Sequence, residues 1–293
     1  MKNVLIIGAK GQLGRDCLDV FKDVSGLNGV DLPEADLSDP GVCRDVLDRL
    51  QPEIIVNCAA YTAVDACETD KSCWKANAEL PGNLADWAAE NGAFLAHIST
   101  DYIFSGDKPL FEVLLETEPP APVSEYGRSK LAGEQSVMER CANSAILRTA
   151  WLYGGSGKNF LKTMLRLTLQ NPGKELKVVS DQFGSPTWSY TLARQIRAVA
   201  ERRAGGIFHA SSEEYCSWYD LACRFLGKLG VEHHFVPCTS EEFPSPTKRP
   251  TNSILENAHL KALGMNLFKG WEDELSDFVE KHGESVMAEV QGK

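Results

Sequence analysis

The feature that most restricts the fold of this chain is a glycine-rich turn placed directly after a short apolar segment near the N-terminus. Val4–Ile7 has the length and composition of a buried strand, and Gly8, Gly11 and Gly14 follow it at once. The next stretch, Gln12–Val24, is typical of a helix. Glycines in such a turn let a pyrophosphate approach the backbone at the positive end of the helix. The segment therefore predicts a dinucleotide-binding unit.

Strand-like and helical stretches alternate over the first 150 residues, which predicts a parallel sheet with helices on both faces. The expected strands are Val4–Ile7, Gly29–Asp31, Ile54–Asn57, Phe94–Ser99 and Ala145–Thr149. The expected helices are Gln12–Val24, Val42–Leu50, Ser72–Asn91 and Tyr126–Cys141. The predicted fold class is α/β, a doubly wound parallel sheet of the Rossmann type.

After residue 151 the alternation becomes looser. Helices are expected at Phe160–Thr168, Leu192–Arg203, Ser217–Leu229 and Trp271–Lys281, and strands at Leu176–Val179 and Ile207–Ala210. We expect a smaller, interwoven C-terminal α/β substrate domain. Residues 1–153 and about 187–212 would form the nucleotide-binding domain, and residues of about 154–186 and 213–293 the substrate-binding domain.

The composition narrows the class of partner. The 41 acidic and 30 basic residues give a net charge of −11, which argues against nucleic acid as the partner. The longest apolar runs are strand-sized and well short of the ~20 residues of a membrane span. The N-terminus has no apolar run of the ~7–15 residues found in signal peptides. A cytoplasmic protein without a membrane partner is expected.

The cysteines predict reduced thiols. Their number, nine, is odd, and none forms a Cys-x-x-Cys pair. Several lie in apolar or helical stretches and are expected to be buried: Cys17, Cys58, Cys141 and Cys223. The adjacent His233 and His234 have no further ligand at a useful spacing, so the residues predict no metal site.

A carboxylate at the end of the second strand indicates where the nucleotide ribose would bind. Asp31 follows Gly14 by 17 residues and is placed to accept hydrogen bonds from an adenosine ribose. Its charge would repel a 2′-phosphate, which favours NADH. Lys10, within the glycine turn, is a cation that would tolerate NADPH.

Three side chains predict a catalytic site. Tyr126 and Lys130 stand four residues apart on one face of a helix, and Thr100 ends the fourth expected strand, where ligands bind in open α/β sheets. A lysine cation near a phenol lowers its pKa from about 10, so we expect Lys130 to prepare Tyr126 as a proton donor. Thr100 would hydrogen-bond a carbonyl oxygen of the substrate. The small residues of Asn57–Tyr61 would let the cofactor pass closely.

These residues belong to longer segments that resemble one family, the dTDP-4-dehydrorhamnose reductases, within the extended short-chain dehydrogenase/reductases. The spacing G-x-x-G-x-x-G of the turn is typical of that superfamily. The matching segments appear in the family's order over nearly the whole chain: Gly8–Gly14 (GAKGQLG), Asn57–Asp65 (NCAAYTAVD), Ser99–Phe104 (STDYIF), Tyr126–Glu134 (YGRSKLAGE), Arg148–Gly154 (RTAWLYG), Asp181–Thr187 (DQFGSPT) and Arg249–Leu255 (RPTNSIL).

The resemblance implies reduction of the C4 ketone of dTDP-4-dehydro-L-rhamnose by NADH or NADPH, the last step of dTDP-L-rhamnose synthesis for cell-surface polysaccharides. It implies that Lys130 holds the nicotinamide ribose and that Tyr126 donates the proton. The remaining cofactor residues would be Gly8, Gly11, Gln12, Leu13 and Gly14 at the pyrophosphate, Asp31 at the ribose, and Ala59, Ala60 and Tyr61 along the middle of the cofactor. The substrate residues would be Thr100, Asp101, Tyr126, Trp151 as a wall of the sugar pocket, and Arg249 at the diphosphate.

The sequence departs from the family in the loop between Thr100 and Tyr126, where Phe111–Glu116 is longer and more apolar. Family members that pair through Mg²⁺ use acidic residues that cannot be placed here, so the metal and the choice between monomer and homodimer stay open. Two other functions remain. One is another nucleotide-sugar epimerase, dehydratase or reductase of the superfamily. The other is a non-catalytic regulatory subunit similar to that of methionine adenosyltransferase.

Overall fold

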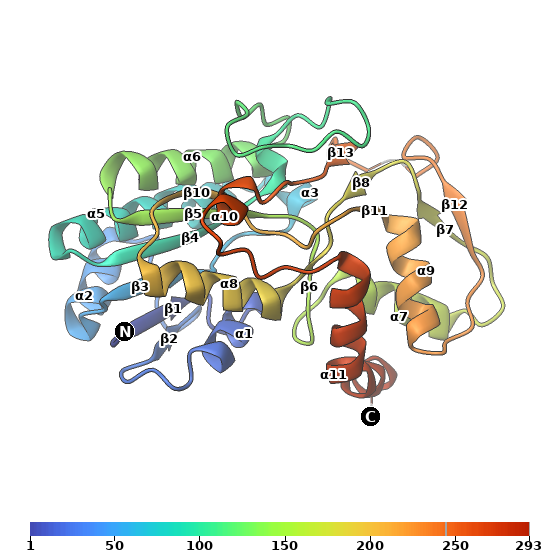
Figure 1. Cartoon of the computed structure of the whole chain (residues 1–293), viewed down its shortest axis with the longest axis horizontal. Coiled ribbons are helices and arrows are strands. Elements are labelled where there is room, and N and C mark those ends of the chain that lie inside the picture. Colours follow the sequence, from blue (N-terminus) through green and yellow to red (C-terminus); the bar gives the residue numbers. More distant parts are fainter. Residues whose placement is uncertain (244, 293) are drawn as a thin grey trace.

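A computed structural model describes residues 1–243 and 245–292. At its centre lies a six-stranded parallel sheet with the strand order β10-β5-β4-β3-β1-β2 (Figure 1). The strands are β1 (Val4–Ile7), β2 (Asn28–Val30), β3 (Ile54–Asn57), β4 (Phe94–Thr100), β5 (Ser144–Thr149) and β10 (Gly206–His209). The strand order reverses at β1, and ligands bind at the carboxyl edge of such a switch point. The predicted doubly wound α/β fold is confirmed.

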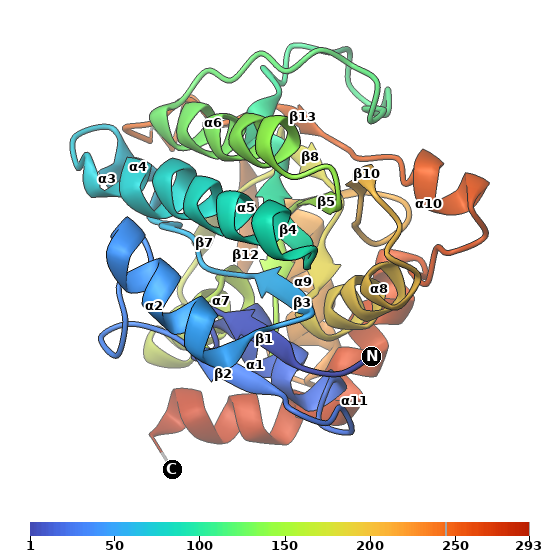
Figure 2. The same ribbon diagram turned by 90° about the vertical axis from the view of Figure 1, so that its left-hand side faces the viewer.

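Helices cover both faces of this sheet, because successive side chains of each strand point alternately into two apolar cores. Figure 2 shows α2 (Pro40–Leu50), α5 (Leu80–Asn91) and α6 (Glu125–Arg140) in one layer, with α1 (Gln12–Val20) and α8 (Ser189–Arg202) across the strands from them. In β1, the side chains of Val4 and Ile6 join the core under α1 and α8, whereas those of Leu5 and Ile7 join the other core.

The second half of the chain builds a separate apolar core at the right of Figure 1. Three helices enclose it: α7 (Phe160–Gln170), α9 (Trp218–Lys228) and α11 (Trp271–Gln291). Small sheets accompany them, formed by β6 (Leu152–Tyr153) with β9 (Thr187–Trp188), by β7 (Leu176–Val179) with β12 (Phe235–Cys238), and by β8 (Phe183–Gly184) with β11 (Cys216–Ser217) and β13 (Asn252–Ser253). Between these pieces, α8 and β10 return to the large sheet.

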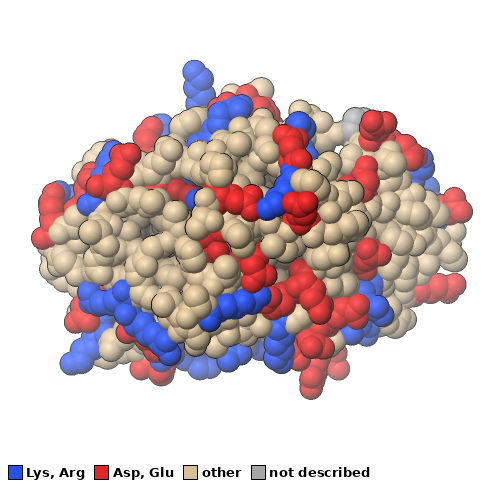
Figure 3. Space-filling view, turned by 45° about the horizontal axis from the view of Figure 1, so that its top comes forward, with Lys and Arg blue, Asp and Glu red and all other residues tan. Residues whose placement is uncertain are grey.

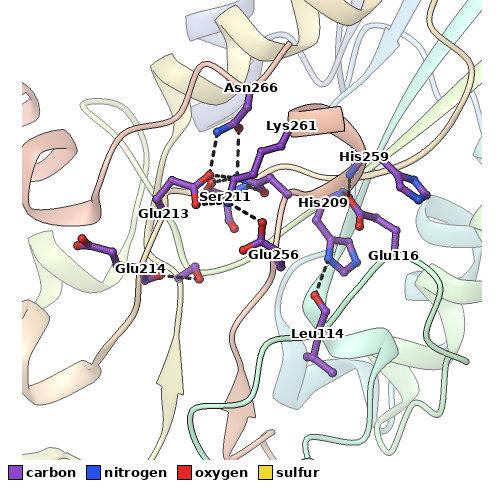
Figure 4. A network of polar contacts seen from close by, with 12 residues as sticks. Leu114, Glu116, His209, Ser211, Glu213, Glu214, Glu256, His259, Lys261 and Asn266 are labelled. Carbon is purple, nitrogen blue, oxygen red and sulfur yellow. Dashed lines mark hydrogen bonds and ion pairs between the residues drawn. The ribbon is translucent and has the colours of Figure 1, made fainter. Parts of the chain in front are cut away.

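One buried carboxylate joins three segments that are far apart in the sequence (Figure 4). The Oε1 atom of Glu116 accepts hydrogen bonds from the backbone N–H of His209, 3.1 Å away, and of His259, 3.0 Å away. His209 ends β10, and His259 belongs to α10 (Ala258–Ala262). Two residues before Glu116, the Leu114 N–H donates to the Ile254 carbonyl over 2.7 Å. The loop that precedes α6 is thus attached to both halves of the chain.

The structure corrects the bounds of several expected helices. The helix expected at Gln12–Val24 ends at Val20. The helix expected at Trp271–Lys281 runs to Gln291, passing Gly283, where an added Cβ would lie 3.1 Å from Leu229. The helix expected at Ser72–Asn91 is interrupted: α4 (Ser72–Trp74) leads into a π-helical turn, η1 (Lys75–Glu79), before α5 begins.

The cysteines also differ from expectation in part. All nine are free thiols; Cys17 and Cys141 are buried as predicted, but Cys58 and Cys223 are partly exposed. On the face drawn in Figure 3, acidic and basic side chains lie close together in many places. Within residues 1–243 and 245–292, no helix has both the length and the apolar character that crossing a membrane requires.

Candidate functional site

A cavity of about 650 Å³ opens at the carboxyl edge of β1, β2 and β3. Its lining brings together many of the residues expected to bind the cofactor: Gly8, Gly11, Asp31, Ala59, Ala60 and Tyr61. Lys10 and Cys58 line it as well. These residues are far apart in the sequence, and the parallel order of their strands places them at one edge.

Gly8 and Gly14 cannot carry a side chain, for different physical reasons. Gly8 has a φ of +75°, and an added Cβ would lie 2.7 Å from the Ala59 backbone N. A Cβ on Gly14 would lie 2.0 Å from the Gly8 carbonyl oxygen, so Gly14 allows α1 to pack against the turn. Side chains would fill both spaces. The bare turn at the start of α1 therefore fits the pyrophosphate of a dinucleotide.

Two further residues of the turn point away from the cavity. The Leu13 side chain is buried in the core under α1, which leaves only its backbone for a phosphate. The Gln12 Oε1 atom accepts a hydrogen bond of 2.9 Å from Nδ2 of Asn159, which caps α7. Gln12 thus links the nucleotide turn to the second half of the chain.

Asp31 lies at the tip of β2 in a network of backbone donors. Its Oδ2 accepts from the Lys10 N–H over 2.6 Å, and its Oδ1 accepts from the Leu32 N–H over 2.7 Å. The Lys10 ammonium forms an ion pair with Glu34, and this contact lowers the pKa of Glu34. The cation that the sequence suggested for a 2′-phosphate is therefore neutralised by a carboxylate that sequence reasoning missed.

The three expected catalytic residues lie at neighbouring positions. Thr100 ends β4, and Tyr126 and Lys130 lie in the first turns of α6, which Ser124 caps by accepting from the Gly127 N–H over 3.1 Å. The Tyr126 ring packs edge-on against Tyr102 with the ring centres 5.4 Å apart. Burial raises the pKa of Tyr126 above its usual value, and the Thr100 hydroxyl offsets part of this effect.

We expected Lys130 to lower the pKa of that phenol, and the structure differs. The Lys130 Nζ atom donates to the Ile98 carbonyl over 2.6 Å, and the influences that act on the Tyr126 pKa are dominated by burial. Burial also lowers the pKa of Lys130 to about 8, although Glu134 and Cys58 raise it. Tyr126 consequently keeps its proton at neutral pH, which suits a proton donor.

Asp101 is a buried acid beside Thr100. Burial raises its pKa to about 6, while hydrogen bonds from Thr100 and Ser253 act in the opposite direction. The Thr100 hydroxyl lies 2.9 Å from Asp101 Oδ1. Asp101 is thus fully enclosed and is connected to the candidate catalytic threonine.

Sequence reasoning missed Asn77, a fully buried residue in the π-helical turn η1. Its Oδ1 accepts from the Tyr61 N–H over 2.8 Å, and its Nδ2 donates to the Tyr61 carbonyl over 3.2 Å and to Ser129 Oγ over 3.0 Å. The Ser129 hydroxyl in turn donates to the Tyr126 carbonyl over 2.8 Å. Asn77 therefore fixes the loop after β3, which contains Tyr61, relative to the helix that carries Tyr126 and Lys130. A π turn has no clear sequence signature, although such turns often occur at functional sites.

The two remaining expected substrate residues have different neighbours. The Trp151 ring stacks on Trp218 with centres 3.6 Å apart, at a backbone φ of +48°. Arg249 Nη2 lies 3.4 Å from Asp65 Oδ2. Burial raises the pKa of Tyr102, the neighbour of Tyr126, to about 12, and the charge of Arg249 offsets part of this rise. Phe111, in the loop that departs from the family, packs on Phe183 and Tyr215.

No group of three or more His, Cys, Asp or Glu side chains in residues 1–243 and 245–292 is arranged to hold a metal ion.

Comparison with known proteins places these residues in a family. A family model described as the RmlD substrate binding domain matches residues 1–283. The chain is 37% identical over 277 residues to a dTDP-4-dehydrorhamnose reductase of Burkholderia thailandensis, with 88% of this chain and 91% of that protein covered. It is 39% identical over 282 residues to a probable dTDP-4,6-dihydroxy-2-methyloxan-3-one 4-ketoreductase of Streptomyces antibioticus, with 93% of each covered. A crystal structure of the dTDP-4-dehydrorhamnose reductase of Bacillus anthracis with NADP is similar at a TM-score of 0.90 and 36% identity, covering 96% of this chain and 100% of that chain.

Proposed function

Because the chain belongs to the dTDP-4-dehydrorhamnose reductase family, we propose that it is an oxidoreductase that reduces the C4 ketone of a dTDP-4-keto-6-deoxy sugar with NADH or NADPH. The observation that carries the proposal is the placement of Thr100 and Tyr126 beside one another, with Lys130 on the same helix. A nucleotide-sized cavity lies at the same sheet edge.

The bound cofactor would supply the hydride. The residues of the chain do the rest: Tyr126 gives its hydroxyl proton to the oxygen that becomes the C4 alcohol, and Thr100 hydrogen-bonds that oxygen while charge develops on it. The raised pKa of Tyr126 keeps the proton available at neutral pH. Lys130, held by the Ile98 carbonyl, would orient the nicotinamide ribose.

Asp101, Trp151 and Arg249 would contact the substrate, as the family resemblance implies. Trp151 offers an aromatic face that its stack with Trp218 holds rigid. Arg249 is partly exposed and paired only weakly with Asp65, so its charge is available to a diphosphate. Both residues come from segments that match the family.

The exact sugar is a narrower question. Relatives of nearly equal identity have names that specify two different 4-keto sugars. We take dTDP-4-dehydro-L-rhamnose as the first candidate, since the segments Ser99–Phe104 and Asp181–Thr187 match that reductase family. We propose NADH as the preferred cofactor, because Asp31 lines the cavity at the end of β2 and Glu34 forms an ion pair with Lys10.

The test mixes the purified protein with a 4-keto-6-deoxy dTDP-sugar and follows the absorbance of the reduced nicotinamide. One NAD(P)H should be consumed for each sugar reduced, because the hydride leaves in the product. Sugar conversion without net nicotinamide oxidation would establish an epimerase instead. Cofactor binding with no change in sugar or cofactor would support the regulatory-subunit function.

A further inference from the structure

Two thiols lie side by side beneath the nucleotide cavity. Cys58 follows β3 directly and lines the cavity next to Ala59. Cys17 lies on α1, the helix that the glycine turn opens. Their Sγ atoms are 3.8 Å apart, which is van der Waals contact, although 41 residues separate them in the sequence.

The two thiols have unequal surroundings. Cys17 is completely buried among the apolar residues of its core, and burial raises its pKa well above the usual value. Cys58 is partly exposed in the cavity. It also lies close to Lys130: burial lowers the pKa of that ammonium group to about 8, and the charges of Glu134 and Cys58 oppose this fall. A partly exposed thiol beside a lysine cation is the setting in which cysteines react with oxidants.

We propose that Cys58 and Cys17 form a peroxide-sensitive dithiol, and that its oxidation to a disulfide closes the nucleotide site. The proposal rests on the proposed function, because it assigns a regulation to that same cofactor site. The oxidant would be a small hydroperoxide such as H₂O₂.

The chemistry balances in two steps. The Cys58 sulfur attacks one peroxide oxygen and breaks the O–O bond; the thiol proton and the released hydroxide form water, and the sulfur becomes a sulfenic acid. The Cys17 sulfur then attacks that sulfur, forming the S–S bond. The sulfenic hydroxyl leaves with the Cys17 proton as a second water. Two thiols are oxidised by two electrons, and one H₂O₂ is reduced to two waters.

The disulfide would alter the cavity because the two sulfurs must approach. A disulfide is about 2.05 Å long, so the contact of 3.8 Å would shorten by about 1.8 Å. The Gly8 turn lies between α1 and the strand end that carries Cys58, and a Cβ on Gly8 would already collide with Ala59. Pulling α1 toward Cys58 therefore compresses the turn that would hold the pyrophosphate.

A second pair of thiols provides an internal comparison. The Cys73 Sγ atom lies 3.9 Å from the Cys67 carbonyl oxygen, and both residues are buried beside Tyr126. Neither lines the nucleotide cavity. A hydroperoxide entering the cavity should therefore react at Cys58 before it reaches this pair.

The experiment treats the reduced wild-type protein with one equivalent of H₂O₂, with and without saturating NADH. Mass spectrometry without reductant should find residues 16–22 joined to residues 50–71 after trypsin digestion. Because Cys58 and Cys67 share the second peptide, Cys67→Ala is the matched variant, and it should keep the link. The Kd for NADH should rise at least ~10-fold on oxidation. Dithiothreitol should return the Kd to its original value. NADH that is present during the peroxide treatment should prevent the link.

Cys17→Ala tests the second step. It should lose the disulfide, accumulate a sulfenic acid at Cys58 that dimedone traps, and keep most of its NADH affinity after peroxide. If Cys17→Ala does not fold, the wild-type link and its protection by NADH decide the question. A wild-type protein without the link, or one with the link and an unchanged Kd, would overturn the proposal. Failure of the untreated protein to bind NADH would instead contradict the proposed function.

Discussion

At the scale of single residues, burial determines the protonation state of the main candidate catalytic residue. Tyr126 is enclosed by Tyr102 and Thr100, and burial raises its pKa above the usual value of about 10. Tyr126→Phe removes the proton and leaves the packing. We expect kcat to fall by at least ~10²-fold, with the Kd for NADH nearly unchanged. Steady-state kinetics together with a fluorescence titration measure both, and a wild-type kcat would remove Tyr126 from the mechanism.

Asp31 is the residue that we propose controls the choice of cofactor. Asp31→Ala deletes an acceptor for the adenosine ribose and removes the negative charge that opposes a 2′-phosphate. The Kd for NADH should therefore rise more than the Kd for NADPH. Glu34→Gln is the matched variant, because it frees Lys10 without touching Asp31 and should tighten NADPH alone by a few-fold. An unchanged ratio of the two Kd values in Asp31→Ala would show that Asp31 does not face the ribose.

Asp101 makes the stability of the protein depend on pH. Burial raises its pKa to about 6 in the folded chain, against about 3.9 for an unfolded aspartate. Between these values the folded state holds a proton that the unfolded state has lost, so this contribution to stability falls as the pH rises from about 4 to 6. Asp101→Asn cannot titrate. The free energy of unfolding of Asp101→Asn relative to wild type should increase from pH 4 to 6 and then level off, as urea denaturation at four pH values would measure. A difference independent of pH would contradict it.

At the scale of secondary-structure elements, the π turn η1 links the loop after β3, which contains Tyr61, to α6. Asn77→Ala removes the hydrogen bonds to Tyr61 and Ser129 and leaves buried backbone groups unpaired. We expect a loss of about 2–3 kcal/mol in the free energy of unfolding, together with a lower kcat and a higher KM for NADH. Asn91→Ala, at the exposed end of α5, is the control and should change neither kinetic constant. A purely structural role for Asn77 would lower stability with kcat and KM unchanged.

The elements also show what the sequence can and cannot predict. Long periodic segments such as α8 and strands such as β3 follow from apolar spacing, so the central sheet was foreseen. The two-residue strands β6 and β9 are defined by their pairing with each other, and no local sequence pattern predicts them. The prediction ended α11 at Lys281, but the helix continues through Gly283, whose missing side chain allows close packing against Leu229. At the site, motifs predicted residues on strand ends but not Asn77 or Glu34, whose roles arise from the fold.

At the scale of the whole molecule, Glu116 connects segments from both halves of the chain. Glu116→Ala would leave the buried N–H of His209 and the partly buried N–H of His259 without this acceptor. We expect a loss of about 2 kcal/mol or more in the free energy of unfolding and faster proteolysis between residues 105 and 118. Glu112→Ala, an exposed neighbour, should stay within about 0.5 kcal/mol of wild type. Equal stability of the two variants would show that Glu116 does not hold the segments together.

Because α8 and β10 join the large sheet from late in the sequence, the sheet stays incomplete while the ribosome synthesises the chain. The glycine turn and β3 have emerged by residue 61, but the helix that covers α1 and the edge strand beside β5 end only at residues 202 and 209. At a synthesis rate of about 5–20 residues per second, the nascent sheet waits roughly 7–30 s with one apolar face uncovered. Leu13, Cys17 and Phe21 pack under α8 in the finished core, and during that interval they are surface that a chaperone can bind. The nucleotide site of a newly made molecule therefore matures late, although its first residues are among the earliest to leave the ribosome.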